Sequence, residues 1–502
     1  MDLFSNLALG FATASTLTNL GFCLIGVLLG TLIGVLPGIG ATATIAMLLP
    51  LTYKIADPVT SLIMLAGIYY GAPYGGSTTA ILVNMPGESS SAVTAIDGYQ
   101  MAKKGRAGPA LAIAAIGSFF AGTVATMIVA VLAIPLIAYA LKFSTSETFA
   151  LMVLGLILAV ALASGSVIKA LAMVVLGVLL GLVGSDTISG DVRFAFDIPE
   201  LYEGFNFVAV AVGLFGVAEI LRNLENERTR DAKIAEIGAL YPSRDDWKQM
   251  AGPAARGTLL GSLLGVLPGG GAILASFASY TLEKRISKSP KEFGQGAVAG
   301  VAGPESANNA AAQTSFIPLL TLGIPANPVM ALMIGAMIIK GVIPGPNVAT
   351  ENQSLFWGLI ASMWIGNLML VILNLPLVGL WVKLLTVPYY ILFPIIMSFC
   401  AIGVYSVNSN VYDLYTVAGF GLLGYVLMKL RCEPAPLLLG FVLGDQLEEN
   451  LRQSMIKAFG DPWAMISRPI TATVLVLALV VLVATLLPSV RKKREEVFVE
   501  DE

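Results

Sequence analysis

The chain of 502 residues contains no histidine, three cysteines and only 12% charged residues. Soluble domains carry roughly a quarter of their residues as charged ones, so water is not the main solvent of this protein. Without histidine, any proton transfer near neutral pH depends on carboxylates. The cysteines lie in or beside apolar segments without paired spacing, which argues against disulfides and metal clusters. They are Cys23, Cys400 and Cys432.

The sequence lacks the features that several function classes require. The net charge is −3 and the basic residues form no patch with interleaved aromatics, so no nucleic-acid partner is expected. There is no H-E-x-x-H motif and no nucleophile with a partnered base, so the chain is not expected to be an enzyme and needs no cofactor. The N-terminus lacks the basic region and cleavage site of a signal peptide, so the first apolar segment is expected to stay in the mature protein.

Long apolar runs dominate what is present. Each approaches or exceeds the ~20 residues with which a helix crosses a bilayer. The sequence therefore predicts an all-α polytopic protein surrounded by lipid. The runs are 109–140, 147–183, 205–221, 355–382, 388–405, 411–428 and 469–488.

An internal repeat links the two halves. Residues 26–41 (GVLLGTLIGVLPGIGA) and 257–272 (GTLLGSLLGVLPGGGA) match at 12 of 16 positions without a gap. The four-residue spacing of their glycines places small residues on one helix face, where another backbone can approach closely. For the first three glycines of each copy, this packing role is favoured over ligand contact.

Each copy ends in a proline and clustered glycines, which break a helix and free its backbone groups. Such breaks survive in a membrane only inside protein or beside a water-filled cavity, and paired breaks point to a transporter binding site. A structural kink is the alternative. In the second copy, segments 256–267 and 272–282 are too short to span, which predicts a re-entrant hairpin with its tip at 268–271.

The distribution of lysine and arginine predicts that the two repeats are inverted. Basic residues flank the second glycine helix at 283–292, whereas in the first half they gather at 103–106, which corresponds to 339–342. Loops rich in lysine and arginine lie in the cytoplasm. The predicted parts are an N-terminal membrane repeat at 1–221, a cytoplasmic linker at 222–256, a C-terminal repeat with additional helices at 257–488, and a cytoplasmic tail at 489–502.

Small polar residues cluster at the breaks and downstream of them. Half-helix N-termini with hydroxyl and amide groups suit a carboxylate, and backbone and amide oxygens suit sodium. For any single residue, a role in bonding neighbouring helices is about as well supported. The candidate substrate or ion ligands are Gly38, Gly40, Ser77, Thr78, Thr79, Asn84, Gly87, Glu88, Gly269, Gly271, Glu305, Ser306, Asn308, Asn309, Gly323 and Asn327; the candidate sodium ligands among them are Gly38, Asn84, Gly269, Ser306 and Asn308.

Two acids stand out because a carboxylate inside a membrane is costly and therefore a functional candidate: Glu88 and Glu305. Either one can bind a coupling ion or carry a proton. Since an oxygen cage is already present in the polar breaks, sodium is favoured over the proton. Asp97, which lies close to the basic loop at 103–106, is expected to be an ordinary solvated acid.

Four strings resemble one family, the large membrane subunit (TctA) of the bacterial tripartite tricarboxylate transporters. They lie at 34–53, 69–111, 265–272 and 303–325, and the resemblance in length and order covers nearly the whole chain. The resemblance implies about 12 transmembrane segments with inverted repeats, in a fold related to elevator-type ion transporters. It also implies a multi-pass protein of the bacterial inner membrane.

The same resemblance implies partners and a task. A small four-helix membrane subunit and a periplasmic binding protein would cooperate with this chain to import a small organic acid, driven by a sodium or proton gradient. A homodimer is compatible with the same resemblance. The rival interpretations are a self-sufficient organic-anion carrier, a passive channel and, with least support, a membrane-embedded enzyme.

Topology can be tested with single cysteines introduced into a variant that lacks the native three. We expect positions in 222–256, 283–292, 103–106 and the tail to react only with reagents that reach the cytoplasm, because of their lysine and arginine content. Periplasmic labelling at two or more of these places would contradict the inverted arrangement.

Overall fold

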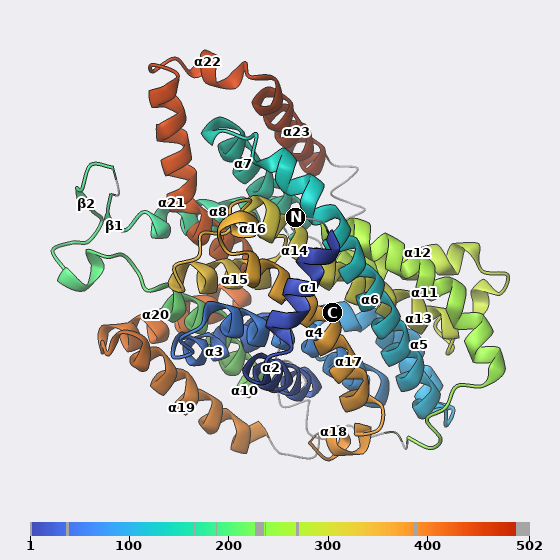
Figure 1. Cartoon of the computed structure of the whole chain (residues 1–502). Helices are drawn as coiled ribbons and strands as arrows, with labels where there is room; N and C mark the ends of the chain where they lie inside the picture. The colour runs from blue at the N-terminus through green and yellow to red at the C-terminus, as the bar shows by residue number, and fades with distance from the viewer. Residues whose placement is uncertain are drawn as a thin grey trace.

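The computed structural model describes residues 3–36, 40–163, 166–186, 188–225, 235, 237–267, 271–384 and 389–487. Helices make up most of these residues, and a short two-stranded antiparallel sheet projects from one side (Figure 1). Its strands are β1 (Gly184–Ser185) and β2 (Val192–Arg193).

The elements before the polar linker run from α1 to α10, with η1 and η2 as single 3₁₀ turns and η3 as a π-helical segment that joins α9 to α10. Their bounds are α1 Leu3–Ala14, α2 Leu17–Val35, α3 Ala41–Tyr53, α4 Pro58–Val83, η1 Ser89–Ser91, α5 Ala92–Lys103, α6 Ala107–Ala140, α7 Thr145–Leu162, α8 Val167–Gly181, η2 Pro199–Leu201, α9 Phe207–Ala211, η3 Val212–Val217 and α10 Ala218–Glu225.

The elements after the linker run from α11 to α23. Their bounds are α11 Arg244–Gly265, α12 Gly271–Ile286, η5 Pro290–Glu292, α13 Val298–Thr314, α14 Phe316–Leu322, α15 Pro328–Ile339, α16 Val348–Glu351, α17 Gln353–Asn374, α18 Val378–Leu384, α19 Tyr389–Asn408, α20 Tyr412–Lys429, α21 Pro434–Lys457, α22 Pro462–Ile466 and α23 Pro469–Leu486.

Helices of membrane-spanning length and composition are present, as the apolar runs predict. Five described helices meet both criteria, and several shorter apolar helices accompany them. These findings confirm the all-α membrane class, while the number of 12 spans stays a prediction. The five are Leu17–Val35, Ala107–Ala140, Phe207–Glu225, Gln353–Asn374 and Pro469–Leu486.

The glycine row of the first half packs against a neighbouring backbone. A Cβ added to Gly26, Gly30 or Gly34 of α2 would lie only 2.3–2.5 Å from a carbonyl oxygen of α4. Those oxygens belong to Met64, Ile68 and Ala72, so the contacts advance along both helices together and α2 runs parallel to α4. Only glycine permits so close an approach of two helices.

The second half repeats this packing. Gly257, Gly261 and Gly265 of α11 lie equally close to carbonyl oxygens of α13, at positions 303, 307 and 311. The contacts between α4 and α13 advance in opposite directions along the two helices. Tyr69 of α4 bonds Ser315 at the end of α13, whereas Ser77, eight residues later in α4, lies against Glu305, which comes earlier in α13. The helices α4 and α13 therefore run in opposite directions, and so do the glycine helices packed on them.

The helices α5 and α15 end with the same backbone geometry. Lys104 and Lys340 are each followed by a glycine with a positive φ, 74° at Gly105 and 72° at Gly341. The next N–H donates to Met101 O in one half and to Met337 O in the other, at 2.9 Å in both. The sequence correspondence between 103–106 and 339–342 is thus repeated in backbone geometry.

The two lysines each reach into the other half. Lys104 Nζ donates to Gln295 O in the loop after α12, and Lys340 Nζ donates to Tyr53 O and Ile55 O in the loop after α3. We name α2 with α3 the first hairpin and α11 with α12 the second hairpin. Each lysine therefore bonds carbonyl oxygens at or beyond the end of the second arm of the hairpin in the other half. This exchange ties the halves together at two corresponding places.

Asp97 overturns the expectation of a solvated acid. Its side chain is fully buried, and Oδ1 accepts N–H groups from Gly294, Gly296 and Ala297 at 2.7–2.8 Å. Tyr280 OH donates to Oδ2 at 3.0 Å. Sequence separation concealed this role, because the acceptor and its donors lie about 200 residues apart.

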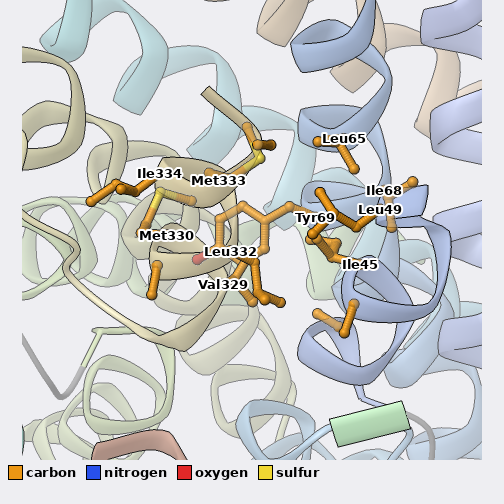
Figure 2. Packing of buried hydrophobic residues seen from close by; sticks show 14 of the residues in the cluster. Ile45, Leu49, Leu65, Ile68, Tyr69, Val329, Met330, Leu332, Met333 and Ile334 are labelled. Carbon is orange, nitrogen blue, oxygen red and sulfur yellow. The ribbon is translucent and has the colours of Figure 1, made fainter. Parts of the chain in front are cut away.

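Apolar packing joins the first hairpin to the second half. Figure 2 shows side chains of α3 and α4 facing those of α15, with Tyr69 extending between the two groups. The labelled residues belong to one buried cluster. The hairpin arm α3 is consequently held between α4 and α15. The residues labelled in Figure 2 are Ile45 and Leu49 of α3, Leu65, Ile68 and Tyr69 of α4, and Val329, Met330, Leu332, Met333 and Ile334 of α15.

Helix extends into both ends of the predicted linker, since α10 continues to Glu225 and α11 begins at Arg244. Between them, Ile237 O accepts from Gly108 N–H at 2.8 Å, and in the first turn of α11 Asp246 pairs with Arg106. The predicted tail at 489–502 lies outside the described residues, and the division into membrane repeats, linker and tail stays a prediction.

Ion pairs hold the β1–β2 hairpin to the end of α21. Arg452 Nη1 lies 2.6 Å from Asp186 Oδ2, and Arg193 Nη1 lies 2.8 Å from Glu448 Oε1. The backbone N–H of Ile188, with Arg452, holds the pKa of Asp186 well below its usual range. The loop is thereby fixed to the helical body at its base.

The glycine packing can be tested by adding one methyl group. Gly30→Ala or Gly261→Ala should lower the stability of the solubilised protein by about 1–3 kcal/mol, because the new Cβ overlaps a backbone carbonyl. Gly21→Ala is the matched control in α2, since a Cβ there meets nothing within 4 Å. Thermal unfolding in detergent measures both, and equal melting temperatures for Gly21→Ala and Gly30→Ala would contradict the packing account.

Asp97→Ala should cost about 3 kcal/mol or more, because three backbone donors lose a charged acceptor. Glu292→Ala removes an exposed acid close to the same loop and should change stability by less than about 0.5 kcal/mol. Hydrogen exchange of the 294–297 amides would locate the effect. Unchanged protection of these amides in Asp97→Ala would rule out the proposed restraint.

Candidate functional site

Glu305 is a buried carboxylate in the middle of α13, with only 1% of its surface exposed. Its Oε1 accepts from the hydroxyl of Thr94 on α5, and its Oε2 accepts from Ser118 of α6 at 3.4 Å. The consecutive helices α5 and α6 of the first half therefore meet α13 of the second half at this carboxylate. A carboxylate in such a place is costly unless hydrogen bonds or a cation compensate it.

Amide and hydroxyl groups of α13 extend the polar cluster. Asn309 Nδ2 donates to Ser118 Oγ at 2.7 Å and to Glu305 O at 3.1 Å. Ser306 Oγ and Asn308 Oδ1 are buried and have no hydrogen-bond partner among the described residues. Unpaired acceptors of this kind are available to a ligand.

The segment after α4 brings Glu88 toward the same region. Glu88 is half-buried, accepts from Ser90, and faces the Asn308 side chain. A Cβ on Gly87 would lie 2.0 Å from Gly34 O at the end of α2, so only glycine fits there. The segment at 87–91 therefore begins against the C-terminal end of α2.

The hydroxyl cluster of α4 is buried, but its residues have different surroundings. Ser77 and Thr78 lie beside Glu305, and Thr79 donates to Gly76 O at 2.9 Å. Asn84 terminates α4 in the left-handed conformation, with φ at 57°, and its side chain is exposed. Asn84 is therefore separated from the buried cluster.

A second polar group surrounds Tyr69. Its hydroxyl bonds Ser315 Oγ at 3.3 Å and accepts from Asn327 Nδ2 at 3.0 Å. Asn327 also caps α15, because its side chain accepts from Met330 N–H. Gly323, with φ at 70°, ends α14 just before this cap.

The N-termini of α3, α12 and α15 lie at or near the predicted breaks. A Cβ on Gly271, the first residue of α12, would lie 3.7 Å from Asn327 Nδ2, so the N-termini of α12 and α15 are neighbours. Gly40 begins α3, and a Cβ there would meet nothing within 4 Å. The predicted ligands Gly38 and Gly269 lie outside the described residues.

Sequence reasoning missed the partners that other helices contribute. Tyr69, Tyr74, Thr94, Ser118 and Asn374 all face the predicted residues. Ser118 and Asn374 could have been found as isolated polar residues in the apolar runs at 109–140 and 355–382. Buried polar groups in membrane helices need partners, so such residues are candidates for contacts between helices. The pairing itself required the fold.

A larger cavity of about 310 Å³ opens elsewhere, between the N-terminal ends of α9 and α20 and the end of α19. Its lining includes Glu200, Glu203 and Asp413 and no lysine or arginine among the described residues. Asp413 is buried and accepts from Asn206 and Asn408. Such a lining repels a carboxylate, so the anion site is better sought at the helix N-termini.

Long apolar helices and paired glycine helices, with a buried carboxylate between them, define a multi-pass membrane protein of the transporter class. Residues 20–439 match the tripartite tricarboxylate transporter TctA family. The chain belongs to this family and is the large membrane subunit of such a transporter. The family is one of transporters, and its tripartite organisation includes partner subunits and a binding protein.

Two relatives come from Agrobacterium vitis. An uncharacterized 52.8 kDa protein in the TAR-I ttuC' 3' region is 64% identical over 502 residues, the whole of both chains. An uncharacterized protein in the TAR-II ttuC' 3' region is 66% identical over 242 residues, which is 48% of this chain and the whole of that relative. No solved structure matches the chain.

Proposed function

We propose that this subunit imports a small organic acid across the bacterial inner membrane by alternating access of an elevator-like unit. The substrate arrives on a periplasmic binding protein, and a small four-helix membrane subunit completes the complex. A sodium gradient drives uptake. The observation that carries the proposal is the opposed pair of glycine helices, each followed by a return helix, with the polar cluster of Glu305 between them.

Opposite directions of the two glycine helices support inverted repeats. Because α2 runs parallel to α4, and α11 runs parallel to α13, the reversal between α4 and α13 makes the two hairpins approach from opposite ends. The matching ends of α5 and α15 add a second correspondence. Paired interruptions in inverted halves are the arrangement in which transporters bind substrate near the midplane.

Helix N-termini support a carboxylate substrate. The N-termini of α12 and α15 adjoin one another, and their helix dipoles favour negative charge. Asn327 adds an amide at this place. The site therefore needs no arginine to hold an anion.

Oxygen-rich surroundings support sodium as the coupling ion. The cluster contains the carboxylate of Glu305, hydroxyl groups and amide oxygens, which are hard ligands suited to sodium. A proton-coupled cycle would place the proton on Glu88 or Glu305, since the chain has no histidine.

Uptake of labelled carboxylates into proteoliposomes, with the partner subunits and binding protein present, tests the proposal. We expect an inward sodium gradient alone to drive accumulation. Glu305→Gln should raise the sodium concentration for half-maximal uptake by about tenfold without abolishing uptake, because a charged ligand becomes neutral. Accumulation driven by a pH gradient in sodium-free buffer, and lost in Glu88→Gln or Glu305→Gln, would assign coupling to the proton instead.

A further inference from the structure

A small cavity lies beside Glu305, where α4, α6, α13 and α17 meet. Its volume is about 10 Å³, measured as the room left for the centre of a water-sized sphere. One water molecule or one small ion needs about this much room. Its polar lining consists of Tyr74, Ser77, Thr78, Ser118, Glu305 and Asn374.

Each of the four hydroxyl groups of this lining already donates its proton, and Ser118 Oγ donates to Glu305 Oε2 at 3.4 Å. Tyr74 OH donates to Asn367 Oδ1 at 2.8 Å, Ser77 Oγ to Pro73 O at 2.8 Å, and Thr78 Oγ1 to Tyr74 O at 3.2 Å. Because each proton is already used, lone pairs are what these groups can offer to the cavity. The wall is therefore rich in acceptors.

Asn374 adds an acceptor with no partner of its own. Its Nδ2 donates to Leu370 O at 2.9 Å and to Thr31 Oγ1 at 3.4 Å, which fixes the amide. Its Oδ1 has no hydrogen-bond partner among the described residues. Since Asn374 is only 5% exposed, solvent does not replace the missing partner. An unpaired buried oxygen costs stability unless a ligand satisfies it.

Charge selects the kind of ligand. Glu305 is the one acid among the lining residues, and none of them is basic. A monovalent cation would neutralise this carboxylate, whereas a divalent ion would leave excess charge in an apolar interior. Magnesium also retains several waters, for which the cavity has no room.

We propose that this cavity binds one dehydrated sodium ion, with Glu305, Asn374 Oδ1 and the hydroxyl oxygens of Thr78 and Ser118 as ligands. This inference rests on the proposed sodium coupling and names its site. The site differs from the one expected at the hairpin tips, because α6 and α17 lie outside both repeat motifs. Sodium bound here would join α13 to α4, α6 and α17.

Binding of ²²Na⁺ to the purified full-length chain in nanodiscs tests the site without requiring transport. Wild-type protein should bind sodium in preference to potassium. Asn374→Leu and Thr78→Val should each weaken sodium binding by about tenfold to a hundredfold, as expected for one lost ligand to a charge. Thr78→Val changes shape little, so it keeps the test valid if Asn374→Leu fails to fold.

Ser362→Ala is the matched control for Asn374→Leu. It removes a buried hydroxyl from α17, the helix that carries Asn374, at a place outside the cavity. It should leave sodium affinity unchanged. Thermal unfolding in sodium against choline gives a second readout, and the rise in melting temperature should disappear in Asn374→Leu while persisting in Ser362→Ala.

The outcomes separate this site from the proposed function. Wild-type affinity in both Asn374→Leu and Thr78→Val, or no sodium binding at all in a chain that supports sodium-driven uptake, would overturn the site and leave the function intact. Unaltered sodium binding with no carboxylate uptake by the complete complex would overturn the function and leave the site.

Discussion

The close approach of two glycine helices to their neighbours is the constraint on which the rest of the structure depends. In each half, three glycines bring a helix against successive carbonyl oxygens of the helix that follows the hairpin. In lipid, apolar side chains gain little by leaving the solvent, so close backbone packing and hydrogen bonds must hold helices together. This contact sets the position of each hairpin end relative to α4 and α13, and hence the position of the polar site.

Hydrogen bonds across the two halves complete this arrangement. Lys104 and Lys340 each bond carbonyls at the base of the opposite hairpin, and Asp97 accepts three N–H groups from the loop before α13. Charged groups can do this because they compensate backbone groups that helices leave unpaired. The two halves are therefore fixed to each other close to the ends of α3 and α12.

The polar interior combines two different electrostatic environments. Helix N-termini at α12 and α15 favour an anion, whereas the acceptor lining beside Glu305 favours a cation. A carboxylate and a small cation placed in neighbouring parts of one interior reduce each other's desolvation cost. The sodium-coupled uptake that we propose would have this physical basis.

The sequence alone determined the membrane class and the glycine repeat, because composition and spacing carry these signals directly, and it singled out Glu305 as a candidate. Candidate ligands on α4 and α13, among them Ser77 and Glu305, lie inside continuous helices and not at helix breaks. Only the tertiary structure decided which residues meet. Ser118 and Asn374 reach the cavity of Glu305 from helices outside the matching glycine motifs at 26–41 and 257–272. Asp97 is a buried acceptor for the loop before α13 and not a solvated acid. Contacts between residues 200 apart depend on how helices cross, and local pattern does not encode that crossing.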